Sequence, residues 1–148
     1  MAKLMFDSIL VVCTGNICRS PIGERLIKAK LPGIKVDSAG TGALVGHKAD
    51  ESAIRVAEIN GLSLDGHLGK QFTQKLASQY GLILVMEKRH IEHIDRIAPE
   101  ARGKVMLFGH WLNQQEIPDP YRKSDEAFSY VFQLLNKASQ LWVEKLAR

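Results

Sequence analysis

The sequence has 148 residues, of which 45% are hydrophobic and 24% are charged, as expected of one ordinary globular domain. The formal charge is +4, but the basic residues are spread along the chain and do not form the patch that nucleic-acid binding requires. Two cysteines are too few for a disulfide framework, and no apolar run approaches the roughly 20 residues that cross a bilayer. We therefore expect one soluble, cytoplasmic domain over residues 1–148, without a signal peptide, nucleic acid or membrane insertion, and monomeric by default.

Short apolar runs alternate with helical patterns along the chain. Continuous apolar runs, which are typical of strands buried on both faces, predict strands at residues 8–12, 81–86 and 104–108, with a weaker candidate at 35–38. Helices are predicted at residues 21–30, 50–60, 73–79, 88–97 and 124–146. Such an alternation predicts an α/β fold with a parallel sheet, in which ligands bind beyond the carboxyl ends of the strands. The first strand ends at Cys13.

The loop after this first strand has the residues of an oxyanion site. Its sequence at residues 13–21 is CTGNICRSP. Gly15 tolerates a positive φ and Asn16 tolerates the left-handed region, so a turn here can direct successive backbone N–H groups into one concavity. Ser20 suits an N-cap and Pro21 suits the first helical position, so we expect a helix to begin here and add its positive dipole end.

Cys13 is expected at the floor of this concavity, and Arg19 adds a planar guanidinium that matches two phosphate oxygens. Because helix N-termini and cations favour a thiolate, we expect the sulfur to attack phosphorus and form a cysteinyl-phosphate intermediate. Ser20 is close enough in sequence to hydrogen-bond the sulfur and help it leave. The alternative is a buried apolar cysteine beside a surface arginine. Bare Cys-x5-Arg spacing favours that alternative, whereas the Gly-Asn and Arg-Ser-Pro around it favour the oxyanion site.

The loop resembles the signature Cys-x-Gly-Asn-x-Cys-Arg-Ser-Pro of the low-molecular-weight protein-tyrosine phosphatases. Residues 36–40 (VDSAG) resemble the second-strand motif of that family, and residues 116–121 (EIPDPY) resemble its acid loop. Further stretches are similar to its bacterial Wzb/Etp-type enzymes, which are associated with capsule and exopolysaccharide export: residues 42–46, 86–92 and 102–109.

The resemblance implies a four-stranded parallel sheet flanked by helices on both faces, with the phosphate-binding loop between the first strand and the first helix. It implies a phosphotyrosine-bearing protein as substrate, namely the tyrosine-rich tail of an autophosphorylating bacterial tyrosine kinase. Inorganic phosphate would be the product, and neither a cofactor nor a metal is expected.

Asp119 is the candidate proton donor. A phenol has a pKa near 10, so a tyrosine leaving group gains from a positioned acid, which typically contributes about 10²–10⁴-fold. Pro118 and Pro120 restrict the backbone around Asp119 and hold its carboxyl on a stiff loop. From the residues alone, a general acid and an ordinary turn aspartate are about equally favoured. The family resemblance favours the general acid, which would also take a proton from the attacking water.

The resemblance assigns supporting positions as well. Tyr121 would form one aromatic wall of the substrate cleft, the alternative being a partly buried loop tyrosine, and Leu44 would form the opposite wall. Ser38 and His67 match positions that hydrogen-bond to Asn16, although His67 alone would be expected in an exposed turn. The phosphate-loop candidates are Thr14, Gly15, Asn16, Ile17, Cys18 and Ser20.

Three residues invite other interpretations. His90 and His93 suggest a zinc site, but no third ligand has convincing spacing, and we expect this helix to be an ordinary solvated one. Cys18 follows Cys13 closely around the loop. It is expected either to capture an oxidised Cys13 as a reversible disulfide or to be a small buried hydrophobe.

Three competing functions share part of this loop. Thioredoxin-linked arsenate reductases need further cysteines toward the C-terminus, and none follows Cys18. Protein-arginine phosphatases carry Thr where this sequence has Ile17, which favours phosphotyrosine. A non-catalytic phosphotyrosine-binding module could dispense with Cys13 and Asp119, and both are present.

Overall fold

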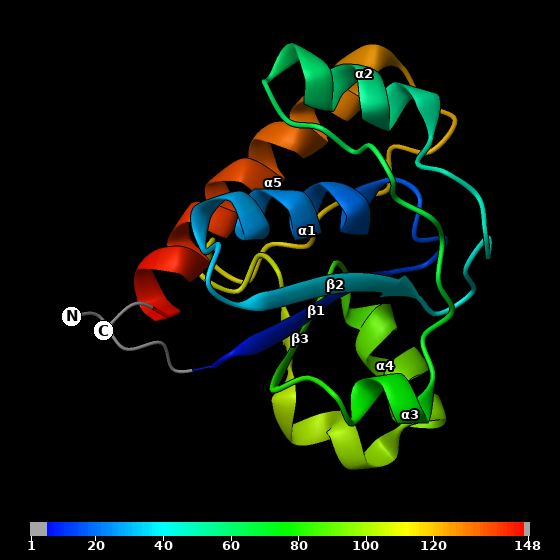
Figure 1. The fold of residues 1–148 in the computed structure, drawn as a ribbon, viewed down its shortest axis with the longest axis vertical. Helices are drawn as coiled ribbons and strands as arrows, with labels where there is room; N and C mark the ends of the chain where they lie inside the picture. Colours follow the sequence, from blue (N-terminus) through cyan, green and yellow to red (C-terminus); the bar gives the residue numbers. More distant parts are fainter. Residues whose placement is uncertain (1–5, 147–148) are drawn as a thin grey trace.

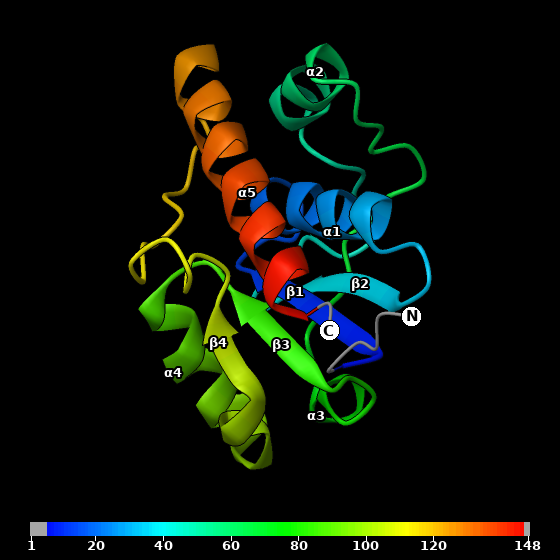
Figure 2. The same cartoon turned by 90° about the vertical axis from the view of Figure 1, so that its left-hand side faces the viewer.

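A four-stranded parallel sheet lies between two layers of helices (Figure 1, Figure 2). The computed structural model describes residues 6–146, so the ends of the predicted domain, residues 1–5 and 147–148, lie outside the described residues. The strands occur in the order β2-β1-β3-β4, and every neighbouring pair is parallel. Their bounds are β1 (Ser8–Cys13), β2 (Lys35–Gly40), β3 (Leu82–Val85) and β4 (Val105–Leu107).

Helices cover both faces of the sheet, which confirms the predicted α/β architecture (Figure 2). One face packs against α1 (Arg19–Lys30) and α5 (Asp125–Leu146), and α2 (Glu51–Ile59) packs on the outer side of these two helices. The other packs against α3 (Gln74–Ala77), α4 (Lys88–Ile97) and the 3₁₀ helix η1 (Pro99–Lys104). Within residues 6–146, no helix combines the length and apolar character needed to cross a membrane.

β1 is one of the two interior strands, and its continuous apolar sequence follows from burial on both sides. Ile9 and Val11 pack with the α1 and α5 layer, whereas Leu10 and Val12 pack with the α4 layer. The chain passes from β1 to β2 on one side and later to β3 on the other, so the carboxyl end of β1 is the point where the strand order diverges. Ligands of α/β proteins bind at such a point, and the loop at residues 14–18 lies there.

The predicted start of the first helix is wrong in one respect. α1 begins at Arg19 with Cys18 in the N-cap position, and no side chain caps it. Ser20 therefore lies inside the first turn, where its hydroxyl bonds to Cys13 and Asn16 instead of to the helix backbone. Residues 99–104 form η1 after the last turn of α4, although no element was predicted at 99–103 and Lys104 was predicted in a strand.

Gly40, the last residue of β2, lies directly against the loop after β1. A Cβ at Gly40 would lie 2.2 Å from the carbonyl oxygen of Thr14 and 3.1 Å from the backbone nitrogen of Asn16. Any larger residue would push the loop away from the sheet, so this glycine is required for the loop to sit where it does.

Gly40→Ala is therefore expected to lower the free energy of unfolding by about 1–3 kcal/mol, because the added methyl overpacks against backbone. Gly33→Ala is the matched control, since a Cβ there meets no atom within 4 Å. The control is expected to change stability by less than about 1 kcal/mol. Denaturant unfolding of both variants checks this, and equal stabilities would show that the close approach carries no cost.

Candidate active site

The loop at residues 13–18 turns its backbone carbonyls away from its own centre. The carbonyls of Cys13, Thr14, Gly15 and Ile17 accept hydrogen bonds of 2.9–3.0 Å from backbone N–H groups of residues 41–50. Because the C=O and N–H of a trans peptide point in opposite directions, the N–H groups that follow these carbonyls are directed to the inner side of the loop. Inward N–H groups at a helix N-terminus form an oxyanion-binding site.

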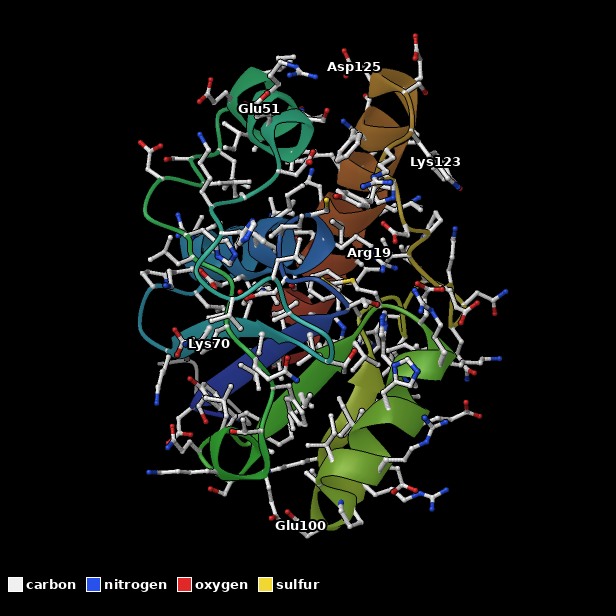
Figure 3. The ribbon with its side chains drawn as sticks, turned by 90° about the vertical axis from the view of Figure 1, so that its right-hand side faces the viewer. Arg19, Glu51, Lys70, Glu100, Lys123 and Asp125 are labelled. Carbon is white, nitrogen blue, oxygen red and sulfur yellow. The ribbon has the colours of Figure 1, made fainter. Side chains whose placement is uncertain are left out.

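A pocket of about 170 Å³ opens over this loop and brings together residues from three distant segments. Arg19 lies at the start of α1, on the side where the loops after the strands gather (Figure 3). Leu44 and Tyr121, each 39% exposed, line the pocket as well. The full lining is Cys13, Thr14, Gly15, Ile17, Cys18, Arg19, Leu44, Asp119 and Tyr121.

Asn16 holds the loop from its outer side. It has a φ of 60°, in the left-handed region that asparagine tolerates, and it is fully buried. Its Oδ1 accepts from the backbone N–H of Lys70 at 2.9 Å, which fixes the orientation of the amide. Its Nδ2 therefore donates to the hydroxyls of Ser20 at 2.8 Å and Ser38 at 3.0 Å.

The buried carboxylate of Glu24 sets the direction of these hydrogen bonds. The Ser38 hydroxyl donates to Glu24 at 2.8 Å and so accepts from Asn16. The Ser20 hydroxyl also accepts from Asn16, which leaves its proton for the Cys13 sulfur 2.9 Å away. Ser20 thus directs an O–H donor at Sγ, an arrangement that stabilises negative charge on the sulfur.

His67 supports the same residue from the backbone side. Its Nε2 lies 2.6 Å from the carbonyl oxygen of Asn16, and because a carbonyl only accepts, this nitrogen carries a proton. The ring is buried, and burial lowers the pKa of His67 despite that hydrogen bond. The structure therefore places Ser38 and His67 on two different groups of Asn16, with His67 buried instead of in an exposed turn.

Arg19 is held by fixed partners, and its side chain is only 2% exposed. Its Nη1 donates to Glu87 and, at 2.8 Å, to the carbonyl oxygen of Ile117. Burial would raise the pKa of Glu87, but hydrogen bonds from Arg89 and Arg19 outweigh burial and lower it to about 2. Glu87 is thus an ionised anchor that keeps the guanidinium at the pocket.

Asp119 lies at the rim of the pocket on a loop that is tied down beside it. Ile117 donates its N–H to the carbonyl of Met86 and gives its own carbonyl to Arg19. The Asp119 carboxyl is 45% exposed, accepts from the N–H of Tyr121 at 3.0 Å, and lies 3.8 Å from Nη2 of Arg19. A carboxyl in this position can exchange protons with solvent while it faces the oxyanion site.

The environment of His90 differs from the predicted one. It was expected on a solvated helix, yet its side chain is completely buried. Its Nδ1 accepts from the N–H of Glu87 at 3.1 Å, so its Nε2 carries the proton and donates to the Thr14 hydroxyl at 2.9 Å. Burial, with help from the charge of Arg19, lowers the pKa of His90 to about 4. In the sequence, the only sign of this pairing is the spacing of three residues between Glu87 and His90 at the start of the helix, which allows a reciprocal capping pair.

Cys18 is buried beside the pocket, and both cysteines are free thiols. Burial raises the pKa of Cys18, with further contributions from Asp50 and Cys13, so it remains a neutral thiol. The two cysteines therefore have different surroundings: the sulfur of Cys13 receives an O–H donor, whereas Cys18 is a buried neutral thiol.

Comparison with known proteins agrees with this geometry. A family model described as low molecular weight phosphotyrosine protein phosphatase matches residues 8–148. The chain therefore belongs to this family of protein-tyrosine phosphatases, which confirms the resemblance of the loop.

Within the family it is a phosphatase of the Wzb/Etp type. It is 60% identical to the phosphatase Etp of Escherichia coli (strain K12) over 148 residues, which cover 100% of both chains. The crystal structure of Wzb from Escherichia coli K30 in complex with sulphate superposes with a TM-score of 0.95 at 71% identity, covering 96% of this chain and 99% of that chain. Wzb of Vibrio vulnificus in complex with benzylphosphonate gives 0.94 at 54% identity, covering 95% and 99%.

The low pKa of His90 predicts a specific pH dependence of stability. Between the ordinary histidine pKa of 6.5 and about 4, the unfolded chain binds a proton that folded His90 does not, so stability falls as the pH drops through this window. His90→Gln removes this proton difference and is expected to reduce the slope of unfolding free energy against pH by up to about 1.4 kcal/mol per pH unit.

Denaturant unfolding at several pH values between 4 and 6.5 measures this slope. His47→Gln, at an exposed histidine, is the control. His67 has a lowered pKa too and leaves a residual slope of the same sign. A His90→Gln slope equal to that of the unmodified protein would contradict the assignment of His90 as a buried neutral group.

Proposed function

We propose that the protein hydrolyses phosphotyrosine through a cysteinyl-phosphate intermediate. The observation that carries the proposal is the sulfur of Cys13, which lies at an oxyanion-binding loop with the Ser20 hydroxyl directed at it. In the first step the Cys13 thiolate attacks phosphorus, the bond to the tyrosine oxygen breaks, and Asp119 gives that oxygen a proton. Arg19 and the loop N–H groups bind the phosphoryl oxygens throughout.

In the second step a water molecule attacks the phosphorus of the intermediate. Asp119, now ionised, takes a proton from this water, and the phosphorus–sulfur bond breaks. The Ser20 hydroxyl stabilises the departing thiolate, and inorganic phosphate leaves. The chemistry requires no metal, because the charge that develops is met by Arg19 and backbone donors.

The side chains that form the walls of the pocket favour a substrate with an aromatic ring. Leu44 and Tyr121 offer apolar surface on which a tyrosine ring can pack. Ile17 places an aliphatic side chain in the pocket, where a phosphorylated guanidinium would need a hydrogen-bond acceptor. Ligands in the related Wzb structures, sulphate and benzylphosphonate, have the tetrahedral oxyanion and benzyl group expected of such a site.

The physiological substrate we propose is the phosphorylated, tyrosine-rich tail of a bacterial tyrosine kinase that controls exopolysaccharide or capsule production, encountered in the cytoplasm. The Wzb/Etp-type resemblance supports this assignment. The formal charge of +4 favours encounter with a multiply phosphorylated, anionic tail.

Peptides that carry phosphotyrosine, phosphoserine or phosphoarginine in one common sequence test the specificity. We expect phosphotyrosine to have the highest kcat/KM by a wide margin. Preference for phosphoarginine would favour the competing function, a protein-arginine phosphatase, and binding without turnover would favour a phosphotyrosine-binding module.

Asp119→Ala distinguishes a general acid from a positioned turn residue. We expect it to lower kcat on a phosphotyrosine peptide by about 10²–10³-fold. An aryl phosphate with an acidic phenol leaving group needs little protonation and is expected to lose far less. Asp65→Ala, at an exposed loop aspartate, is the matched control. Equal losses on both substrates would remove Asp119 from the acid role.

We propose for Cys18 a protective redox role. When peroxide oxidises Cys13 to a sulfenic acid, the Cys18 thiol can displace water from it and form a disulfide, which a thiol reductant reopens. Mass spectrometry should show a disulfide between these two cysteines, with a mass two hydrogens lower than that of the two free thiols. Full recovery of a peroxide-treated Cys18→Ala variant in reductant would contradict the role.

A further inference from the structure

One face of α4 carries basic residues that extend from the active-site pocket along the helix. Arg89, His93 and Arg96 recur at spacings of four and three residues and so share one side of the helix. Arg89 is at the catalytic end, because its Nη2 lies 3.1 Å from Glu87, the carboxylate that also holds Arg19. Arg96 lies near the other end of this face, about 10 Å further along the axis.

A second hollow of about 320 Å³ lies beside this face of the helix. Its lining is Thr14, Thr41, Gly42, His93, Arg96 and Ile97. Thr14 also lines the catalytic pocket, so the two hollows share a wall. The second hollow is thus lined by two threonines, a histidine and an arginine, and no carboxylate lines it.

The basic side chains of this hollow are available to a ligand. In the described part of the chain, no carboxylate lies within 4.0 Å of Arg96 or His93. The adjacent Asp95 is instead 3.8 Å from Arg102. His93 packs edge-on against His90, with ring centroids 6.2 Å apart, which connects this hollow to the residue that holds Thr14.

We propose that this hollow is a second anion subsite, which binds an acidic side chain of the substrate two to four residues from the phosphotyrosine that is hydrolysed. The inference rests on the proposed phosphotyrosine phosphatase function. An extended peptide advances about 3.3–3.6 Å per residue, so such a spacing covers about 7–14 Å, comparable with the length of the basic face. Both candidate ligands of the subsite are anionic side chains: a second phosphotyrosine, or an aspartate or glutamate.

Four series of phosphotyrosine peptides test the subsite. A second position, two to four residues away on either side, carries a non-hydrolysable phosphonate analogue of phosphotyrosine, glutamate, glutamine or unmodified tyrosine. We expect an anion at the best spacing to raise kcat/KM about three- to tenfold, and the gain to shrink as ionic strength rises. A larger gain for the phosphonate than for glutamate would identify phosphate as the preferred ligand. Equal gains would show that the subsite accepts a carboxylate as well as a phosphate.

Arg96→Gln is expected to abolish this gain while leaving kcat/KM on the tyrosine peptide and on a small aryl phosphate unchanged. Arg102→Gln removes the same charge from a neighbouring exposed residue that does not line the hollow, and it should retain the gain. An absent gain at every spacing, a gain that survives Arg96→Gln, or one lost equally in both variants would overturn the subsite. A lack of turnover on all aryl phosphates would instead refute the proposed function.

Discussion

The active site depends on the side-chain amide of Asn16. One oxygen and two N–H groups of this amide contact three segments of the chain, through Lys70, Ser38 and Ser20. These contacts compensate for a left-handed backbone conformation in a loop that has no regular secondary structure. Because each donor and acceptor has one available partner, the network also fixes where the Ser20 proton goes.

The remaining features preserve that arrangement. Outward hydrogen bonds from residues 41–50 hold the loop carbonyls, and Gly40 lets the loop approach β2. On the opposite side, Glu87 and the Ile117 carbonyl hold Arg19, and that same carbonyl belongs to the loop that carries Asp119. The cation and the proton donor are therefore tied to one another, which keeps the reacting groups in register.

Much of the fold could be predicted because its signals are local. The strands are short apolar runs, since β1 and β3 are buried on both faces, and the loop at residues 13–18 carries its glycine, asparagine and arginine in one stretch. The predictions that failed depend on pairing between polar side chains, which the preference of a single residue does not reveal. Ser20 has the composition of a helix cap, but Asn16 and Cys13 compete for its hydroxyl.

His90 was misplaced for the same reason. A histidine in a charged helix gives no local sign that Thr14, 76 residues away, lies against its ring. Glu24 was missed in the same way. Its position in α1 does not reveal that it accepts a hydrogen bond from Ser38 and so sets the direction of the hydrogen bonds around Asn16. Periodicity identifies which side of a helix is buried, whereas the pairing of buried polar groups appears only in three dimensions.

The central claim is that the Ser20 hydroxyl donates a hydrogen bond to the Cys13 sulfur and thereby eases departure of the thiolate. Pre-steady-state kinetics of Ser20→Ala on an activated aryl phosphate test it most directly. The account predicts that breakdown of the cysteinyl phosphate slows more than its formation, so that a burst of phenol is followed by slow turnover and the phosphoenzyme accumulates. A variant in which both steps slow equally, or neither slows, would contradict the account.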